Sequence, residues 1–289
     1  MARKPTRLDG ARFGPWVLIT GASSGIGKGF AEQIAASKIN LVLAARRLSA
    51  LDDLGRELAR RHGIQYRAVQ VDLAGPDFMD TIVEQTQDLD IGLVVSNAGD
   101  MVLGEFVSNP YAELIREARL NVNTHLALAH HFGQRMARRG RGGLLLVSST
   151  AALQGLAYSA NYAAAKAYVH TLGEGLHQEL SSQGVNVTVV LPGATATPML
   201  SRFGADKTSM GRLAMPVEVC VADALKALRA NRAARISGRM NRLAMAAMPR
   251  SARTRLLGRL SKSMVQRATA TDPAVPAQVR TGRSDPSDA

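Results

Sequence analysis

Short apolar runs alternate with amphipathic stretches along most of the chain, and this pattern predicts strands separated by helices. The apolar runs are nearly continuous rather than alternating, and polar or glycine-rich residues follow each of them. The predicted strands cover residues 17–20, 40–45, 66–71, 91–95, 143–147 and 185–191, and residues 236–238 begin a short seventh strand. Continuous apolar strands indicate a parallel sheet that is buried on both faces.

Between these strands, apolar residues recur at three- and four-residue spacing, as Leu51, Leu54 and Leu58 do, which is typical of helices. The predicted helices cover residues 28–37, 48–61, 77–88, 111–139 (one helix or two), 161–182 and 216–231. Right-handed connections between parallel strands then give a doubly wound α/β sheet of the Rossmann type in a single domain. Ligands of such sheets bind outside the carboxyl ends of the strands, where the polar motifs lie.

The first strand leads into a glycine-rich turn, T-G-A-S-S-G-I-G, and then into a helix. This order is typical of a helix N-terminus that holds a phosphate. Gly21 allows the tight turn, Gly25 lets the backbone approach a pyrophosphate, and Gly27 lets the helix pack on the strand. Ser23 and Ser24 add hydroxyl donors. An ordinary strand-to-helix turn is the alternative that this stretch alone leaves open.

The second strand ends in Arg46 and Arg47, with no carboxylate at the position that accepts hydrogen bonds from the ribose of NAD. A planar guanidinium matches a 2′-phosphate instead. The sequence therefore favours NADP(H). Two solvated arginines at the start of a helix are the alternative.

Tyr162 and Lys166 lie four residues apart in a predicted helix and hence on one face of it. An ammonium group beside a phenol favours the phenolate, so we expect Lys166 to lower the pKa of Tyr162. Ser149 ends the fifth strand at the same edge of the sheet. Ser148 points to the other side of that strand and is the less suitable serine.

These motifs, in this order over residues 15–231, resemble the short-chain dehydrogenase/reductase family in its NADP-preferring form. The resemblance implies that Tyr162 is the general acid or base, that Lys166 assists it and bonds the nicotinamide ribose, and that Ser149 donates to the substrate oxygen. It also implies that Asn121 holds a water that links Lys166 to solvent. The residues that it implies for cofactor binding are Gly21, Ser23, Ser24, Gly25, Ile26, Gly27, Arg46, Arg47, Asp72, Leu73, Asn97, Ala98, Gly99, Tyr162, Lys166, Pro192, Gly193, Thr195 and Thr197. For Asp72, a helix cap is the alternative.

Charge is concentrated near the end of the chain. The net charge is +13, and residues 224–271 hold 12 Lys and Arg residues but no acidic residue. Residues 251–268 form a predicted basic amphipathic helix, which packs on the body, contacts a partner subunit or docks on an anionic membrane surface. No nucleic-acid-binding fold accompanies it, and nucleic acid is not expected as a partner. The histidines show no ligand spacing, so we expect no metal site.

The expected organisation is an N-terminal arm (1–14), a catalytic domain (15–238) with a lid over the substrate (198–215), a basic helical extension (239–268) and a disordered tail (269–289). The lid is apolar and rich in methionine, which suits a lipophilic substrate, although it can also simply pack on the body. No stretch is long and apolar enough for a signal peptide or a membrane span. We expect a cytoplasmic protein, peripheral at the inner face of a membrane if the basic helix docks there.

The expected activity is the interconversion of a carbonyl compound and an alcohol by an NADP(H)-dependent oxidoreductase, on an acyl, steroid-like or isoprenoid substrate. The alternatives are an NADP(H)-binding sensor or scaffold without turnover and a lipid-modifying reductase at the membrane surface, such as a 3-oxoacyl reductase. The family resemblance implies a homodimer or homotetramer.

Overall fold

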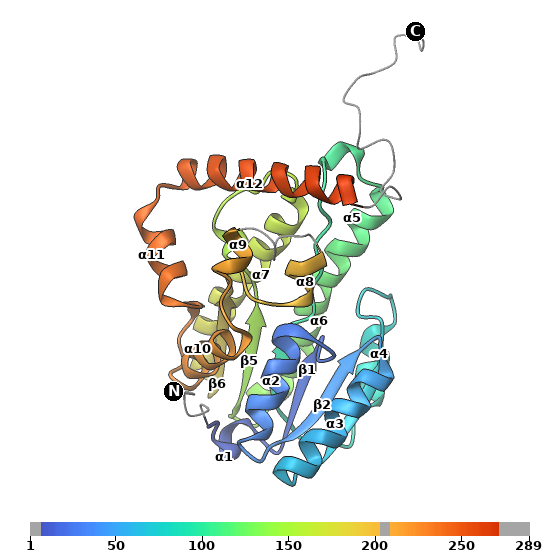
Figure 1. Ribbon diagram of the computed structural model, residues 1–289. Coiled ribbons are helices and arrows are strands. Elements are labelled where there is room, and N and C mark those ends of the chain that lie inside the picture. The colour runs from blue at the N-terminus through green and yellow to red at the C-terminus, as the bar shows by residue number, and fades with distance from the viewer. Residues whose placement is uncertain (1–6, 203–208, 272–289) are drawn as a thin grey trace, which may run out of the picture.

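The computed structural model describes residues 7–202 and 209–271, and within these ranges the chain forms a parallel seven-stranded sheet between two layers of helices (Figure 1). The strand order is β3-β2-β1-β4-β5-β6-β7. The strands are β1 (Trp16–Thr20), β2 (Asn40–Ala45), β3 (Tyr66–Gln70), β4 (Ile91–Ser96), β5 (Gly142–Val147), β6 (Val185–Leu191) and β7 (Ala234–Ile236). The order reverses between β1 and β4, and a ligand crevice is expected there.

One face of the sheet is covered by α2 (Gly25–Ala35), α3 (Leu48–His62) and α10 (Val217–Arg229). The residues that fill this layer include Ile34, Leu51 and Leu225, each of them fully buried. The short helix α1 (Gly10–Phe13) adds Phe13 to the same core. Part of the expected N-terminal arm therefore packs with the body.

The other face is covered by α4 (Phe78–Glu84), α5 (Tyr111–Ala118), α6 (Thr124–Arg138) and α7 (Ala160–Ser181). Leu128, Phe132 and Met136 of α6 recur at helical spacing and are buried against the strands. Between α5 and α6 the chain makes one π-helical turn, η2 (Arg119–Asn123). Short 3₁₀ turns, η1 (Phe106–Ser108) and η3 (Thr150–Leu153), lie in loops at the carboxyl end of the sheet.

The C-terminal extension forms two helices, α11 (Arg239–Ala247) and α12 (Arg250–Thr271), where the sequence predicts one. The second helix crosses the carboxyl end of the sheet (Figure 1), and a Cβ placed on Gly258 would lie 3.5 Å from Ala157. The helix thus rests on the loop that follows β5 and η3, which agrees with packing on the body. The predicted seventh strand lies two residues earlier than expected, as β7.

The predicted lid contains α8 (Pro198–Arg202) and α9 (Ser209–Arg212). Residues 203–208 of the lid, including Phe203, and residues 272–289 of the tail lie outside the described part of the chain. Arg202 forms an ion pair with Asp100, which follows β4. This contact joins α8 to the loop on the opposite side of the crevice.

Candidate active site

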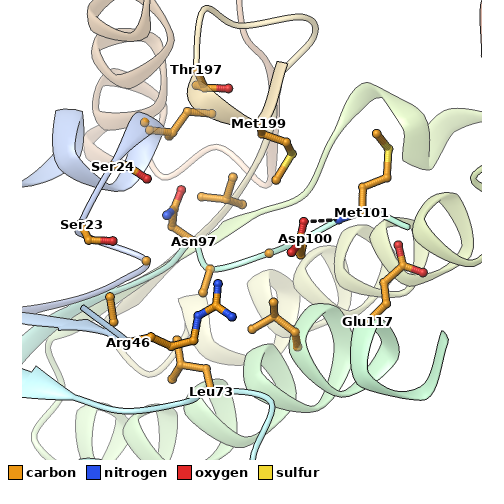
Figure 2. A pocket seen from close by; sticks show the side chains of 18 of the residues that line it. Ser23, Ser24, Arg46, Leu73, Asn97, Asp100, Met101, Glu117, Thr197 and Met199 are labelled. Atoms are coloured by element: carbon orange, nitrogen blue, oxygen red, sulfur yellow. Dashed lines mark hydrogen bonds between the residues drawn. The ribbon is translucent and has the colours of Figure 1, made fainter. Parts of the chain in front are cut away.

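A cleft of about 690 Å³ opens at the carboxyl ends of the central strands, within the usual size range of small-molecule sites (Figure 2). Every strand from β1 to β6 is followed by residues that line it. They include Gly21, Ser23, Ser24, Gly25, Ile26, Arg46, Arg47, Asp72, Leu73, Asn97, Ala98, Gly99, Ser148, Tyr162, Lys166, Pro192 and Thr197. The cleft thus brings together most of the site residues predicted from the sequence.

The glycine-rich turn has the backbone that a phosphate cradle requires. Gly21 and Gly25 have positive φ angles of 67° and 54°, and α2 begins at Gly25, three residues earlier than the sequence predicts. A Cβ at Gly27 would lie 2.2 Å from the carbonyl oxygen of Gly21, so this position admits only glycine. The N-terminus of α2 therefore directs free N–H groups at the cleft, an arrangement that suits the pyrophosphate of a dinucleotide.

The segment after β4 is fastened to the end of β1. Asn97 donates from Nδ2 to the carbonyl oxygen of Thr20 over 2.9 Å, and the Thr20 hydroxyl accepts from the backbone N–H groups of Asn97 and Ala98. These bonds fix the floor of the cleft at the point where the strand order reverses.

Two arginines mark the end of β2. The Arg46 guanidinium extends into the cleft (Figure 2), and Arg47 donates to Ser23 over 3.4 Å. The carboxylate of Asp72 accepts two hydrogen bonds from Arg116 and one from the backbone N–H of Ala74. Burial alone would raise the pKa of Asp72, but these bonds lower it. Asp72 is therefore a paired anion that closes a local turn; it does not cap a helix, because the helix α4 that follows has Asp77 at its N-cap.

Two of the predicted catalytic residues, Tyr162 and Lys166, line one end of the cleft, and Ser149 and Asn121 lie next to them without lining it. Ser149 follows β5 and shares a side-chain hydrogen bond with Tyr162 of α7. Lys166, one turn further on, donates from Nζ to the carbonyl oxygen of Val147 over 3.0 Å and lies 5.7 Å from the centroid of the Tyr162 ring.

Asn121 reaches the same point from the π-helical turn. Its Nδ2 donates to the carbonyl oxygens of Asp100 and Glu117, over 2.7 and 3.0 Å, while its buried Oδ1 has no partner. A Cβ on Gly99 would lie 2.7 Å from that Oδ1 and 3.0 Å from Lys166 Nζ. The unpaired oxygen and the ammonium therefore face the same small space beside Gly99.

The two serines after β5 have different partners. Ser148 is buried and donates to the carbonyl oxygen of Lys166 over 2.7 Å, which ties α7 to the sheet. Ser149 accepts from the backbone N–H of Ala151 and bonds Tyr162. This difference supports Ser149 as the reactive serine.

The pKa of Tyr162 departs from its expected direction. Burial raises it to about 12, and the hydrogen bond with Ser149 offsets this only in part. Lys166 is not among the groups that shift this pKa, and its ammonium donates to the Val147 carbonyl. Burial lowers the pKa of Lys166 to about 8, against an opposing effect of Glu117.

Two predicted cofactor residues lie behind the cleft wall. The Gly193 Cα is packed against Asn241 of α11, and a Cβ there would lie 2.6 Å from that side chain. Thr195 is buried, donates to the carbonyl oxygen of Gly193 and pairs with Met215 in an isolated bridge. Pro192 and Thr197 line the cleft. Gly193 and Thr195 hold the shape of this loop.

Sequence reasoning missed Glu117 and Asp100, two acidic residues that line the catalytic end. Glu117 lies one helical turn before Asn121, and that spacing is the signal that could have found it. The His, Cys, Asp and Glu residues of the described chain form no group of three or more that could hold a metal ion. No described helix has the length and apolar character to cross a membrane.

Residues 15–208 match the family described as short chain dehydrogenase. The chain belongs to this family. The bacterial 7beta-hydroxysteroid dehydrogenase of Collinsella aerofaciens is 32% identical to this short chain dehydrogenase over 222 residues, which cover 75% of this chain and 84% of the relative.

Solved structures agree with the assignment. A structure from a study of 7beta-hydroxysteroid dehydrogenase stereoselectivity has a TM-score of 0.80 and 28% identity, covering 86% of this chain and 98% of the other. A short-chain dehydrogenase from Sphingobium yanoikuyae in complex with NADPH has a TM-score of 0.74 and 30% identity, covering 92% of this chain and all of the other. This short chain dehydrogenase is an oxidoreductase of carbonyl and alcohol groups with a nicotinamide dinucleotide cofactor, and the cleft fits such a group.

Proposed function

We propose that this short chain dehydrogenase uses NADPH to reduce a ketone on a bulky lipophilic substrate, of the steroid-like type, to the corresponding alcohol. The observation that carries the proposal is the Ser149–Tyr162 hydrogen bond at the end of the cleft, with Lys166 and Asn121 beneath it. Apolar side chains of Met101, Val102 and Met199 line the same end and suit a lipophilic substrate.

NADPH is favoured over NADH because the guanidinium of Arg46 lines the cleft and Arg47 lies beside Ser23. Positive charge at this point complements a 2′-phosphate. The NADPH complex of the Sphingobium yanoikuyae relative supports the same choice. The 7beta-hydroxysteroid dehydrogenase relative supports the substrate class.

When bound, the nicotinamide supplies the hydride, and the chain supplies position and a proton. The Tyr162 hydroxyl is protonated at neutral pH, since its pKa lies near 12, and can donate its proton to the carbonyl oxygen of the substrate. Ser149 donates a hydrogen bond to that oxygen as negative charge develops on it. Lys166, with a pKa near 8, can return a proton to Tyr162 from the space that it shares with Asn121.

The test is NADPH consumption over a panel of steroid ketones, 3-oxoacyl thioesters and small ketones, each repeated with NADH. We expect turnover of bulky ketones with NADPH, and none by the Tyr162→Phe variant. Tight NADPH binding without turnover of any carbonyl compound would overturn the proposal and favour a sensor or scaffold.

The proposal includes a homodimer or homotetramer in the cytoplasm. Leu126 of α6 and Tyr168 of α7 are large apolar side chains that are 43% and 39% exposed, which supports contact between subunits along these helices. Light scattering of the purified protein tests the assembly, and a monomer would contradict it. Cell fractionation tests the location.

We also propose peripheral contact with an anionic membrane surface through α11 and α12. Met240, Leu243, Ala244 and Ala247 form an exposed stripe at helical spacing on α11, and α12 exposes Leu256 and Leu260 beside Arg255, Arg259 and Lys262. A second copy of the chain is a poor partner for this surface, because a two-fold contact would place these positive charges next to the same charges of the other copy.

Co-sedimentation with vesicles of phosphatidylglycerol and phosphatidylcholine tests this contact. We expect binding to the anionic vesicles that weakens with salt and is lost in an Arg255→Glu/Arg259→Glu variant, with no binding to pure phosphatidylcholine. Absence of binding at low salt, or dissociation of a dimer by the same variant, would contradict it.

A further inference from the structure

A buried carboxylate, Glu117, lies beside the catalytic residues at the end of α5. The residue is only 3% exposed. Oε1 accepts from the backbone N–H of Val102 over 2.9 Å, and Oε2 accepts from Nδ2 of Asn161 over 2.6 Å. Asn161 directly precedes Tyr162.

These bonds join three separate segments of the site. Val102 belongs to the loop after β4, whose residues Asp100 and Met101 lie next to Glu117 in Figure 2. Asn161 belongs to the first turn of α7 and also donates to the carbonyl oxygen of Leu114. The backbone carbonyl of Glu117 accepts from Asn121. Glu117 therefore contacts three parts of the site: Asn161 next to Tyr162, Asn121, and the Val102 loop that lines the substrate end.

The charge of Glu117 acts on the same groups. The charged side chains that influence it are Asp100, which raises its pKa, and Lys166, which lowers it, while burial is the largest effect and raises it. In return, its negative charge raises the pKa values of Tyr162 and Lys166. No described cation forms an ion pair with Glu117 within 4.0 Å, so two amide donors and the field of Lys166 hold this carboxylate.

Burying a carboxylate in this way is costly, and glutamine would fill the same space without burying a charge. Buried ionisable groups beside a catalytic set are typical of function.

We propose that Glu117 is a positioning residue of the reaction: its carboxylate holds Asn161 and the Val102 loop, and its charge stabilises the ammonium of Lys166. This inference rests on the proposed function of Tyr162 and Lys166. It predicts that the charge of residue 117 and the length of its side chain affect the reaction in different ways that can be measured separately.

The test compares Glu117→Gln, which keeps the length and removes the charge, with Glu117→Asp, which keeps the charge and shortens the reach. Ketone reduction requires Lys166 and Tyr162 protonated, so activity falls as the pH rises through their pKa values. Removing the charge lowers both values. We expect the alkaline limb of kcat to move about 0.5 to 1 pH unit lower in Glu117→Gln, and to stay at its wild-type position in Glu117→Asp while kcat decreases.

Circular dichroism and NADPH affinity confirm that both variants fold. Competitive acetylation of Lys166, measured by mass spectrometry against pH, gives its pKa without turnover and remains informative if no substrate is found. We expect a lower pKa of Lys166 in Glu117→Gln. A Glu117→Gln protein with the wild-type pH profile and the wild-type Lys166 pKa would overturn the inference, as would equal displacement of the limb in both variants. Absence of carbonyl reduction by the wild type would overturn the proposed function alone.

Discussion

The two ends of the cleft differ in how their polar groups are satisfied. At the end formed by β1, β2, β3 and β4, the side chains of Asn97 and Thr20 each bond the backbone of the other residue, and Asp72 is paired with Arg116. At the end formed by β5 and α7, Asn121 Oδ1 has no partner and two buried ionisable groups, Tyr162 and Lys166, have strongly shifted pKa values.

This difference separates binding from chemistry. A surface whose polar groups are already bonded holds its shape and presents N–H groups and guanidinium charges to a ligand. Unpaired or desolvated groups carry unfavourable free energy that bonding to a substrate or water can relieve. The reactive groups are therefore expected at the second end, and substitutions at the two ends should fail in different ways.

The largest effect is expected at the catalytic end. Tyr162→Phe removes only the hydroxyl that bonds Ser149, so kcat for ketone reduction should fall by about 10²- to 10⁴-fold, the usual contribution of a general acid. NADPH affinity, measured by fluorescence titration, should stay near the wild-type value. An equal loss of NADPH binding would erase the distinction between the two ends.

At the binding end, Gly27→Ala introduces a Cβ 2.2 Å from the carbonyl oxygen of Gly21. The overlap should lower the free energy of unfolding by about 1–3 kcal/mol and weaken NADPH binding. Chemical denaturation and NADPH titration measure the two effects. The matched control is Gly175→Ala on α7, where nothing lies within 4 Å of the new Cβ. A Gly27→Ala protein as stable as this control would show that the turn tolerates a side chain.

A smaller and more selective effect is expected for Arg46→Ala. Loss of a charge-assisted contact to a 2′-phosphate should reduce the preference for NADPH over NADH by about 10-fold, with little change for NADH itself. Ratios of kcat/KM with the two cofactors measure it, and Arg47→Ala serves as the comparison. An unchanged ratio in both variants would remove the basis for the NADPH assignment.

The smallest effect is expected for Ser148→Ala, whose hydroxyl bonds the Lys166 carbonyl rather than the substrate side. The free energy of unfolding should fall by about 1 kcal/mol, the usual contribution of one hydrogen bond, while kcat stays within a few-fold of wild type. Ser149→Ala should instead lose most of its activity. The reverse result would exchange the roles of the two serines.

The sequence predicted the parallel sheet and most of the residues that line the cleft, because both depend on local patterns. An apolar run, a positive-φ glycine turn and a four-residue spacing each determine geometry within a few residues. The sheet topology then places the ends of the strands together, so motifs far apart in sequence, such as Asn97 and Tyr162, meet without further information.

The features that the sequence did not predict depend on packing between distant segments. The raised pKa of Tyr162 arises from burial, and the contact of Gly193 with Asn241 arises from the way α11 folds back. Glu117 was not singled out from the sequence, because only the approach of Val102 and Asn161 makes it a buried anion. These properties exist only once the chain has folded.

The π-helical turn at Arg119–Asn123 affects the directions in which side chains point before and after it in the long helical segment. An α-helix advances about 100° per residue, so a continuous helix would tie the direction of Asn121 to that of the core residues Leu128 and Phe132. The π-helical turn uncouples the two directions, and the Asn121 amide bonds the Glu117 carbonyl in place of a backbone donor. Residues of α6 can therefore pack in the core while Asn121, in the π-helical turn, points to the catalytic end of the cleft.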